Sequence, residues 1–482
     1  MKLFQTKPLA RLIAEADAGE HHLKRTLGAG NLVALGIGAI IGAGLFSLTG
    51  IAAADNAGPA VVLSFVVAAI GCAFAGMCYS EFATMIPIAG SAYTYAYATM
   101  GELLAWIIGW DLVLEYAVGA ATVSVSWSSY VIKLLHTFGI ELPPSLIHCP
   151  WDMTPGIINL PAVVIIVLVS TLLMIGISES ARANAFIVVT KVTIVIIVIA
   201  IGFSYIHPEN YTPFIPPNTG VFGEFGISGI MRAAGIIFFA YIGFDAVSTA
   251  AQEARRPQRD MPIGIIGSLV VCTILYVLFA HVLTGMVNYR TFHGDASPVA
   301  TVISLFPSHA LQIAIVVGII AGYTSVILVM LLGQSRVFYS MSRDGLLPSV
   351  FSTIHPKWQT PYRCNLIFMV LVSLISGFTP ISTLGNMTSI GTLLAFVIVC
   401  IGVIVMRRTN PNANRPYRTP FVPIIPILGV LVCLSMMVAL DVMTWYRLFI
   451  WLALGMLIYF GYSRHHSHLT GEQFAGTAVK RH

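Results

Sequence analysis

Apolar runs long enough to cross a lipid bilayer recur along the whole chain, and they constrain its fold more than any other feature. A helix of about 20 residues spans a hydrocarbon core of roughly 30 Å. Charged residues make up only 9% of the 482 residues, whereas a soluble domain carries roughly a quarter. We therefore predict an all-α membrane protein with many spans.

Polar breaks between the apolar runs define twelve predicted spans, whose boundaries are uncertain by about four residues. The polar first 30 residues contain no short apolar core with a cleavage site, so no signal peptide is expected. The predicted spans cover residues 31–54, 60–84, 103–135, 157–177, 181–206, 228–252, 262–287, 309–340, 362–379, 385–406, 423–441 and 445–463.

Positive charges are distributed unequally between the connecting segments. With the N-terminus inside, 20 of the 25 Lys and Arg residues fall in the two tails and in the loops on the same side. Cytoplasmic segments carry such an excess, so both termini are predicted to lie in the cytoplasm and the protein in the cytoplasmic membrane. The same rule accounts for the basic net charge without a nucleic-acid partner.

The first span carries four glycines in the stretch GIGAIIGAGLF, residues 36–46. Three interpretations compete. The spacing approaches that of a dinucleotide-binding loop, although that loop requires a preceding strand in a βαβ unit. Gly38 and Gly42 also form a GxxxG motif, which packs membrane helices closely together. In the third interpretation, the helix is interrupted here.

A second glycine interruption, FAYIGF, favours the third interpretation. It lies in the middle of the sixth span, five spans after the first. Interrupted helices at corresponding positions of two halves mark the binding site of an inverted-repeat transporter. N–H groups freed at a break suit a carboxylate, and freed carbonyl groups suit an ammonium. A substrate that carries both groups is an α-amino acid.

Charged side chains inside the spans are further candidates, because each costs about 2.5–3.5 kcal/mol at the bilayer centre. Lys191, deep in the fifth span, is either a proton-exchanging group or a static partner for an acid. Glu115 and Asp111 share one face of the third span. Glu115 is a counter-ion for Lys191, a second proton site or a structural carboxylate. Asp245 follows the break of the sixth span, where capping or packing is its leading interpretation.

Three motifs in register resemble the amino acid–polyamine–organocation superfamily, most closely its cationic amino acid transporter family and bacterial relatives. They are GIGAIIGAGLF, FFAYIGFDAVSTAAQEARRPQRDMP and GQSRVFYSMSRDGLLP. The resemblance implies a LeuT-type fold, in which spans 1–5 and 6–10 are inverted repeats and two spans are appended. The resemblance divides the chain into a cytoplasmic N-terminal tail (1–30), the first repeat (31–206), an external loop (207–227), the second repeat (228–408), two appended spans (409–463) and a cytoplasmic C-terminal tail (464–482).

The resemblance also implies a set of site residues. Ala43 and Gly44, next to Gly42, are expected to meet the substrate carboxylate through their N–H groups. Phe239 is expected as an aromatic lid, and Lys191 as the group that bridges spans one and eight in proton-coupled relatives. The remaining expected pocket residues, including the carbonyl groups for the ammonium, are Ile40, Ile41, Phe239, Ala240, Ile242 and Ser325.

We therefore predict a secondary transporter that imports L-amino acids by alternating access, driven by protons. The substrate is small and neutral like alanine, cationic like arginine, or both. The alternatives are a proton-independent exchanger and a non-transporting amino acid sensor. No cofactor other than the proton, no metal and no obligate protein partner are expected. An enzyme is disfavoured because the sequence contains neither HExxH nor GxSxG, and none of the seven cysteines forms a CxxC pair.

Overall fold

The computed structural model describes residues 5–8, 27–86, 91–152, 154–176, 181–249, 251 and 254–468. These residues form helices and their connections, and an isolated parallel bridge joins Leu27 to Ala254. In these ranges seven helical segments are long and apolar enough to cross a membrane, and five more apolar helices are shorter. The chain is therefore an all-helical integral membrane protein.

The first half of the chain contains the helices up to residue 205. The main ones are α2 (Ala29–Ile40), η1 (Gly44–Leu48), α3 (Thr49–Ala52), η2 (Ala53–Ala57), α4 (Val61–Met85), α5 (Ser91–Thr99), α6 (Glu102–Val113), η4 (Leu114–Val118), α7 (Gly119–Thr137), α8 (Leu160–Ile175), α9 (Ala181–Gly202) and η6 (Phe203–Tyr205).

The second half begins with another interrupted helix. Its main elements are α10 (Gly226–Ile237), η8 (Phe238–Tyr241), α11 (Ala246–Thr249), α12 (Pro257–Met286), η10 (Tyr289–Phe292), α13 (Pro298–Ile303), α14 (His309–Arg343), α15 (Tyr362–Phe378), α16 (Ile381–Thr409), α17 (Ile424–Ala439), α18 (Val442–Ile458), η12 (Tyr459–Ser463) and α19 (Arg464–His466).

Helix α12 illustrates why apolar runs misplace helix ends. It begins at Pro257, ahead of the predicted residue 262, in the polar sequence PQRD. Proline suits the first helical turn because its missing N–H has no partner there anyway. The Asp260 carboxylate also accepts a hydrogen bond from the backbone N–H of Arg256 at 3.1 Å. These polar residues start the helix outside the apolar run.

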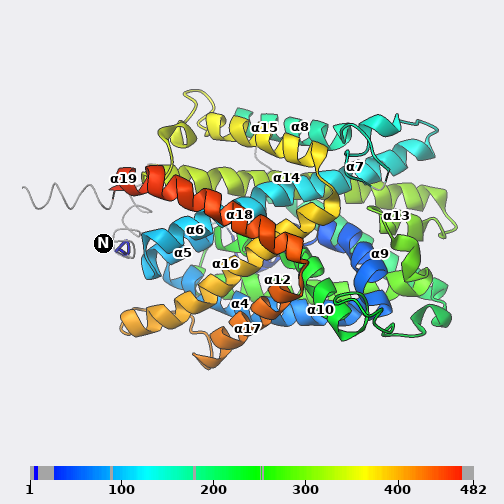
Figure 1. Ribbon diagram of the computed structural model, residues 1–482, viewed down its shortest axis with the longest axis horizontal. Helices are drawn as coiled ribbons and strands as arrows, with labels where there is room; N and C mark the ends of the chain where they lie inside the picture. The colour runs from blue at the N-terminus through cyan, green and yellow to red at the C-terminus, as the bar shows by residue number, and fades with distance from the viewer. Residues whose placement is uncertain are drawn as a thin grey trace, which may run out of the picture.

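The long helices lie mostly along the long axis of the molecule, and the two described chain ends meet at one end of it (Figure 1). We call this end, with residues 5–8 and 463–468, the terminal face; α13 and the loop before α10 lie at the opposite face. The segment 102–137 and α16 are central, with 78% and 72% of their most apolar windows buried. Helix α18, at 22%, is peripheral and exposes apolar side chains, as a lipid-facing helix does.

Polar contacts tie both chain ends to the terminal face. Lys7, which is buried, forms an ion pair with Asp344 after α14 at 2.9 Å. The second oxygen of that carboxylate accepts a hydrogen bond from the Tyr93 hydroxyl at 2.7 Å. The backbone N–H of His468 donates to the Asp344 carbonyl at 3.1 Å. Residues 5–8 and the end of α19 thus belong to the folded body.

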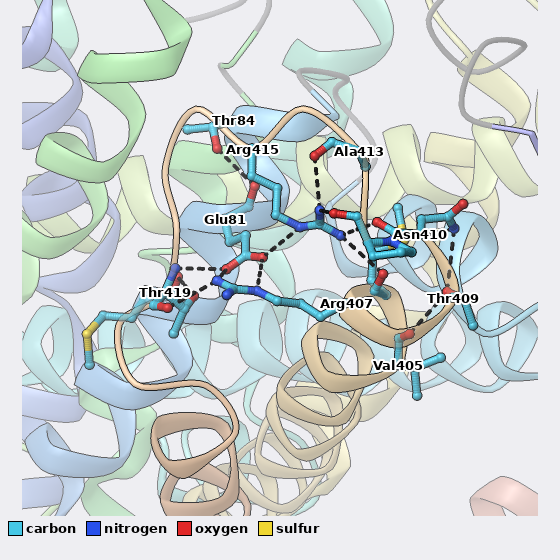
Figure 2. Close-up of polar contacts among 12 residues, drawn as sticks. Glu81, Thr84, Val405, Arg407, Thr409, Asn410, Ala413, Arg415 and Thr419 are labelled. Carbon is cyan, nitrogen blue, oxygen red and sulfur yellow. Dashed lines mark hydrogen bonds and ion pairs between the residues drawn. The ribbon is translucent and has the colours of Figure 1, made fainter.

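A second polar network joins α4 to α16 and the segment after it (Figure 2). The buried carboxylate of Glu81 accepts two hydrogen bonds from Arg407, at 3.0 and 2.8 Å. It also pairs with Arg415 at 3.3 Å and accepts the backbone N–H of Thr419 at 2.8 Å. One acidic side chain therefore holds the ends of two spanning helices together.

Candidate functional site: two helix breaks in contact

The first break separates α2 from η1. Ile41 ends α2 with an extended backbone (φ −71°, ψ 106°). The carbonyl of Gly42 then accepts hydrogen bonds from the N–H groups of Leu45 and Phe46, both at 3.2 Å. Since these bonds close the first turn of the next half-helix, the N–H groups of Ala43 and Gly44 precede it and have no acceptor within it. The sequence expectation of a break at this position agrees with this geometry.

The second break separates η8 from α11. Ile242 is extended (φ −60°, ψ 137°), and Gly243 follows with φ +115°. This backbone conformation is accessible to glycine and strained for residues with a Cβ atom. The N–H of Ile242 donates to the carbonyl of Phe239 at 3.2 Å. That carbonyl, expected as an acceptor for a substrate ammonium, therefore already has a donor from its own chain.

The backbones of the two breaks touch each other directly. A Cβ atom added to Gly44 would overlap the Cα and N atoms of Ala240. A Cβ atom added to Gly243 would lie 2.8 Å from the carbonyl carbon of Ala39. Gly42 differs, because its Cβ would meet only the side chain of Val326 on α14, at 3.4 Å. Close approach therefore requires glycine at residues 44 and 243, but not at 42.

These contacts also decide between the interpretations of GIGAIIGAGLF. Gly36, Gly38, Gly42 and Gly44 are all buried inside this chain, so they do not form an exposed seam for a second copy. Gly36 and Gly38 lie within helix α2, so a helix and not a strand leads into the glycine-rich stretch, which removes the dinucleotide-binding interpretation.

A tyrosine from α12 joins the two breaks. The hydroxyl of Tyr276 lies 3.0 Å from the carbonyl oxygen of Ile40 and 3.0 Å from that of Ala240. Its side chain is fully buried and packs on Tyr241 with ring centroids 5.4 Å apart. Sequence reasoning missed this residue, because one tyrosine in an apolar span carries no pattern. Its hydroxyl stands out little in the run VVCTILYVLFA, which also contains Thr273.

Lys191 connects three helices. Its ammonium donates a hydrogen bond to the carbonyl of Gly38 on α2 at 2.8 Å, and the side chain is 1% exposed. On α14, a Cβ atom added to Gly322 would lie 2.9 Å from the Cε atom of Lys191. The lysine on α9 thus reaches the end of α2 just before the first break, and its stem lies against α14.

The other predicted pocket residues gather around the same breaks. Ser325 is buried on α14, one turn after Gly322 and directly before Val326. All remaining predicted residues are buried, and they flank one break or the other: Ile40, Ile41, Ala43, Phe239, Ala240 and Ile242.

Aromatic side chains cover the first break toward the opposite face. The ring of Phe46 packs against Phe279 at 5.9 Å and Tyr323 at 6.2 Å. The Tyr130 hydroxyl donates to the Phe46 carbonyl at 2.6 Å, and that of Tyr323 lies 3.0 Å from the hydroxyl of Ser47. These residues separate the breaks from the surface on that side.

A cavity of about 820 Å³ lies at the opposite face, near the far ends of η2 and α7. Its lining includes charged and polar side chains. Within it, His293 contacts Asp55 at 2.5 Å. Other lining residues are Ile51, Ser129, Lys133 and Arg447.

Buried acidic side chains lie on the other side of the breaks, toward the terminal face. Asp111 and Glu115 are 1% exposed and Asp245 is fully buried. The Tyr116 hydroxyl donates to a carboxylate oxygen of Asp245 at 2.6 Å. The structure thus gives Asp245 a hydroxyl partner from η4, the element that also carries Glu115.

Comparison with known proteins agrees with this architecture. A sequence profile described as amino acid permease matches residues 27–459, and the chain belongs to this family of the amino acid–polyamine–organocation superfamily. Its members are transporters and not enzymes.

Three relatives differ in the substrates that they are named for. The methylthioribose transporter of Bacillus subtilis (strain 168) is 44% identical over 96% of this chain and 98% of its own length. The branched-chain amino acid permease BcaP of the same organism is 45% identical over 97% and 99%. The vacuolar cationic amino acid transporter 2 of Arabidopsis thaliana is 37% identical over 83% of this chain and 62% of its own.

Proposed function

We propose that this protein imports L-amino acids across the cytoplasmic membrane by alternating access, driven by protons. The terminal face is assigned to the cytoplasmic side, because in the sequence most of the Lys and Arg residues fall in the two tails and in the loops on the same side. In the LeuT-type arrangement, helices α2–α9 form the first repeat and helices α10–α16 form the second. Helices α17 and α18 are the appended pair. In this arrangement the two broken helices occupy equivalent positions in the two repeats.

The contact between the two breaks supports an α-amino acid as the substrate. The carbonyl oxygens of Ile40 and Ala240 share one hydroxyl, that of Tyr276. A hydroxyl has a single hydrogen, so one of the two carbonyls can accept a hydrogen bond from a substrate ammonium. The N–H groups of Ala43 and Gly44 lie at the positive end of the next half-helix and suit a carboxylate. Together they match both charged groups of an amino acid.

Lys191 is the proposed link to the proton. While protonated, its ammonium holds the Gly38 carbonyl (2.8 Å) and so fixes the end of α2 against α9 and α14. Loss of the proton removes a charge-assisted hydrogen bond. That loss releases α2 and opens the path toward the terminal face. The side chain is suited to this role because lysine changes its protonation state readily when buried.

A binding panel of the twenty amino acids against the purified protein tests the substrate class. We expect L-amino acids to raise the midpoint of thermal unfolding, and amino acids with a blocked carboxylate or ammonium group to leave it unchanged. The coupling is tested with Lys191→Ala in proteoliposomes. This variant should still bind the amino acid but lose uptake driven by a pH gradient; intact gradient-driven accumulation would contradict the role of the lysine.

Two alternatives share this site. An exchanger would swap amino acids at the same rate with and without a pH gradient, and a sensor would bind them without any uptake of labelled alanine. Counterflow and net uptake in the same vesicles therefore separate the three functions.

A different substrate class is favoured by one relative, the methylthioribose transporter at 44% identity. Methylthioribose is an uncharged thiosugar, so it offers neither an ammonium for the carbonyls of Ile40 and Ala240 nor a carboxylate for the free N–H groups. Adding this compound to the binding panel tests the alternative directly. Stabilisation by methylthioribose and by no amino acid would replace the amino acid proposal.

A further inference from the structure

The cavity of about 820 Å³ at the opposite face lies directly outside the aromatic side chains that cover the first break. Ser129 lines it and precedes Tyr130, whose hydroxyl donates to the Phe46 carbonyl at 2.6 Å. Ile51 also lines it and belongs to the same broken helix as Phe46. A solute that enters from the opposite face therefore reaches this cavity before it reaches the breaks. We call it the outer cavity.

Basic side chains are few at the opposite face. Among the residues that the structure describes, they are Lys133 near the end of α7, Arg232 on α10, Arg290 in η10 and Arg447 near the start of α18. Lys133 and Arg447 both line the outer cavity. External segments of membrane proteins are normally poor in Lys and Arg, so membrane topology does not explain why two of them share this cavity.

The other two basic side chains have partners, whereas the two in the outer cavity do not. Arg232 donates a hydrogen bond to the Ala439 carbonyl at 3.0 Å, and Arg290 lies over the ring of the preceding tyrosine at 5.7 Å. Within the described part of the chain, the side chains of Lys133 and Arg447 form neither an ion pair nor a hydrogen bond. Arg447 is also half-buried. A guanidinium in this setting can bind a carboxylate through two parallel hydrogen bonds.

Three carboxylates line the same cavity, and each already has a partner. Asp152 and Asp295 accept hydrogen bonds from residues close to them in the chain, at 3.0 and 2.6 Å. Asp55, at the outer end of the first broken helix, contacts His293 at 2.5 Å through one carboxylate oxygen. A carboxylate accepts about four hydrogen bonds, so each of these acids can still bind a positively charged group.

These charges decide which kind of solute fits the outer cavity. A simple anion is attracted by the two cations but repelled by the three carboxylates, and a simple cation meets the reverse. A metal ion does not fit, since no group of three or more His, Cys, Asp or Glu side chains in the described ranges has the geometry to hold one. A solute that carries both a carboxylate and an ammonium is attracted by both sets of charges.

We propose that the outer cavity binds an L-amino acid before the aromatic cover opens. The two cations without partners, Lys133 and Arg447, attract its carboxylate, and Asp55 attracts its ammonium. The cavity volume lies within the usual range of small-molecule sites, roughly 300–1,000 Å³, and exceeds the volume of a small amino acid. The outer cavity therefore selects for the two charged groups and not for the side chain. The class of ligand rests on the proposed function.

Fluorine NMR of the purified full-length protein, labelled with fluorotryptophan, tests this inference. Trp151 lines the outer cavity and is 78% exposed, and Trp151→Phe identifies its resonance among those of the seven tryptophans. Titration with alanine should shift this resonance until the site is saturated. Alanine amide, which lacks the carboxylate, should leave it unchanged.

The double variant Lys133→Gln/Arg447→Gln should weaken this binding by at least about tenfold, because hydrogen bonds between charged groups are the strong ones. Arg290→Gln is the matched control: it removes the same charge from the same face, outside the cavity, and should leave the affinity unchanged. Arg447→Lys keeps the charge and should retain most of the affinity, which guards against misfolding. Gly44→Ala alters the breaks and should retain the shift.

Several results would overturn the outer cavity as a binding site. The Trp151 resonance could stay unshifted in the wild type, or the double variant could bind as tightly as the wild type. Arg290→Gln could weaken binding equally, which would indicate the general charge of that face. Loss of the shift in Gly44→Ala would mean that the resonance reports binding at the breaks.

Uptake by proteoliposomes separates this inference from the proposed function. The double variant should raise the KM for labelled alanine about tenfold with a smaller change in the maximal rate, and Arg290→Gln should change neither. If the wild type takes up no alanine, the proposed function is wrong, whereas the NMR titration still decides whether the outer cavity binds an amino acid. If the wild type takes up alanine and the Trp151 resonance does not shift, only the outer site is wrong.

Discussion

Gly44 on the first broken helix lies against the backbone of Ala240 on the second, with no side chain between them. A Cβ atom at residue 44 would overlap backbone atoms, which cannot rotate away as a side chain can. Overpacking in a well-packed core typically costs about 1–3 kcal/mol, and a backbone overlap exceeds this range. The distance between the two halves of the site thus depends on one missing methyl group.

Gly44→Ala should therefore weaken amino acid binding by at least about tenfold, which corresponds to about 1.4 kcal/mol. Gly42→Ala is the matched control in the same stretch, because its Cβ would make an ordinary contact with Val326 at 3.4 Å. Thermal-shift titration with alanine measures both. Equal losses in the two variants would show that the break requires glycine for flexibility and not for close approach.

Tyr276→Phe should preserve the fold and weaken amino acid binding by about fivefold. The change removes one hydroxyl from the carbonyls of Ile40 and Ala240, and a typical hydrogen bond contributes about 1 kcal/mol. Tyr241→Phe is a suitable control, since its hydroxyl donates at 3.1 Å to the carbonyl of Phe65, outside both breaks. If both variants bind like the wild type, the hydroxyl of Tyr276 has no part in the site.

Gly322→Ala should reduce gradient-driven uptake more than exchange. Its new methyl group would lie 2.9 Å from the Cε atom of Lys191 and push the ammonium away from Gly38. Gly318→Ala, one turn earlier on α14, crowds the apolar side chain of Ile194 instead. Uptake with a pH gradient and counterflow without one, measured on both variants, distinguish a displaced lysine from a general packing defect.

Glu81→Gln should lower the midpoint of thermal unfolding in detergent. Removing one partner of a buried ion pair costs about 3–5 kcal/mol. The loss should lie near the lower end of this range, about 3 kcal/mol, because solvent compensates part of the charge of Arg407, which is 27% exposed, but little of that of Arg415, which is 4% exposed. Arg408→Gln, at the exposed neighbouring residue, should change the midpoint little. An unchanged midpoint in Glu81→Gln would show that the network does not stabilise the fold.

The sequence predicted the helical architecture and the two breaks, because both depend on residues within a single helix. The length of an apolar run predicts a spanning helix, and a high density of glycines predicts its interruption. The burial of Lys191 followed from its position in an apolar run. The partners of these residues did not follow, since they come from distant elements: Tyr276 lies 236 residues from Ile40, and Tyr116 lies 129 residues from Asp245. The different surroundings of Gly42 and Gly44 did not follow either, for the same reason, because the contact with Ala240 is tertiary.

The backbone contacts of Gly44 with Ala240 and of Gly243 with Ala39 also limit how the molecule can move. A contact between two backbones has no side-chain rotamers that could adjust to a displacement, whereas shearing helices are joined by side chains. We therefore expect the two broken helices to move together at the level of the site. We expect the site to open where the two broken helices contact side chains that can change rotamer. These side chains are Lys191 of α9, Val326 of α14 and Tyr116 of η4.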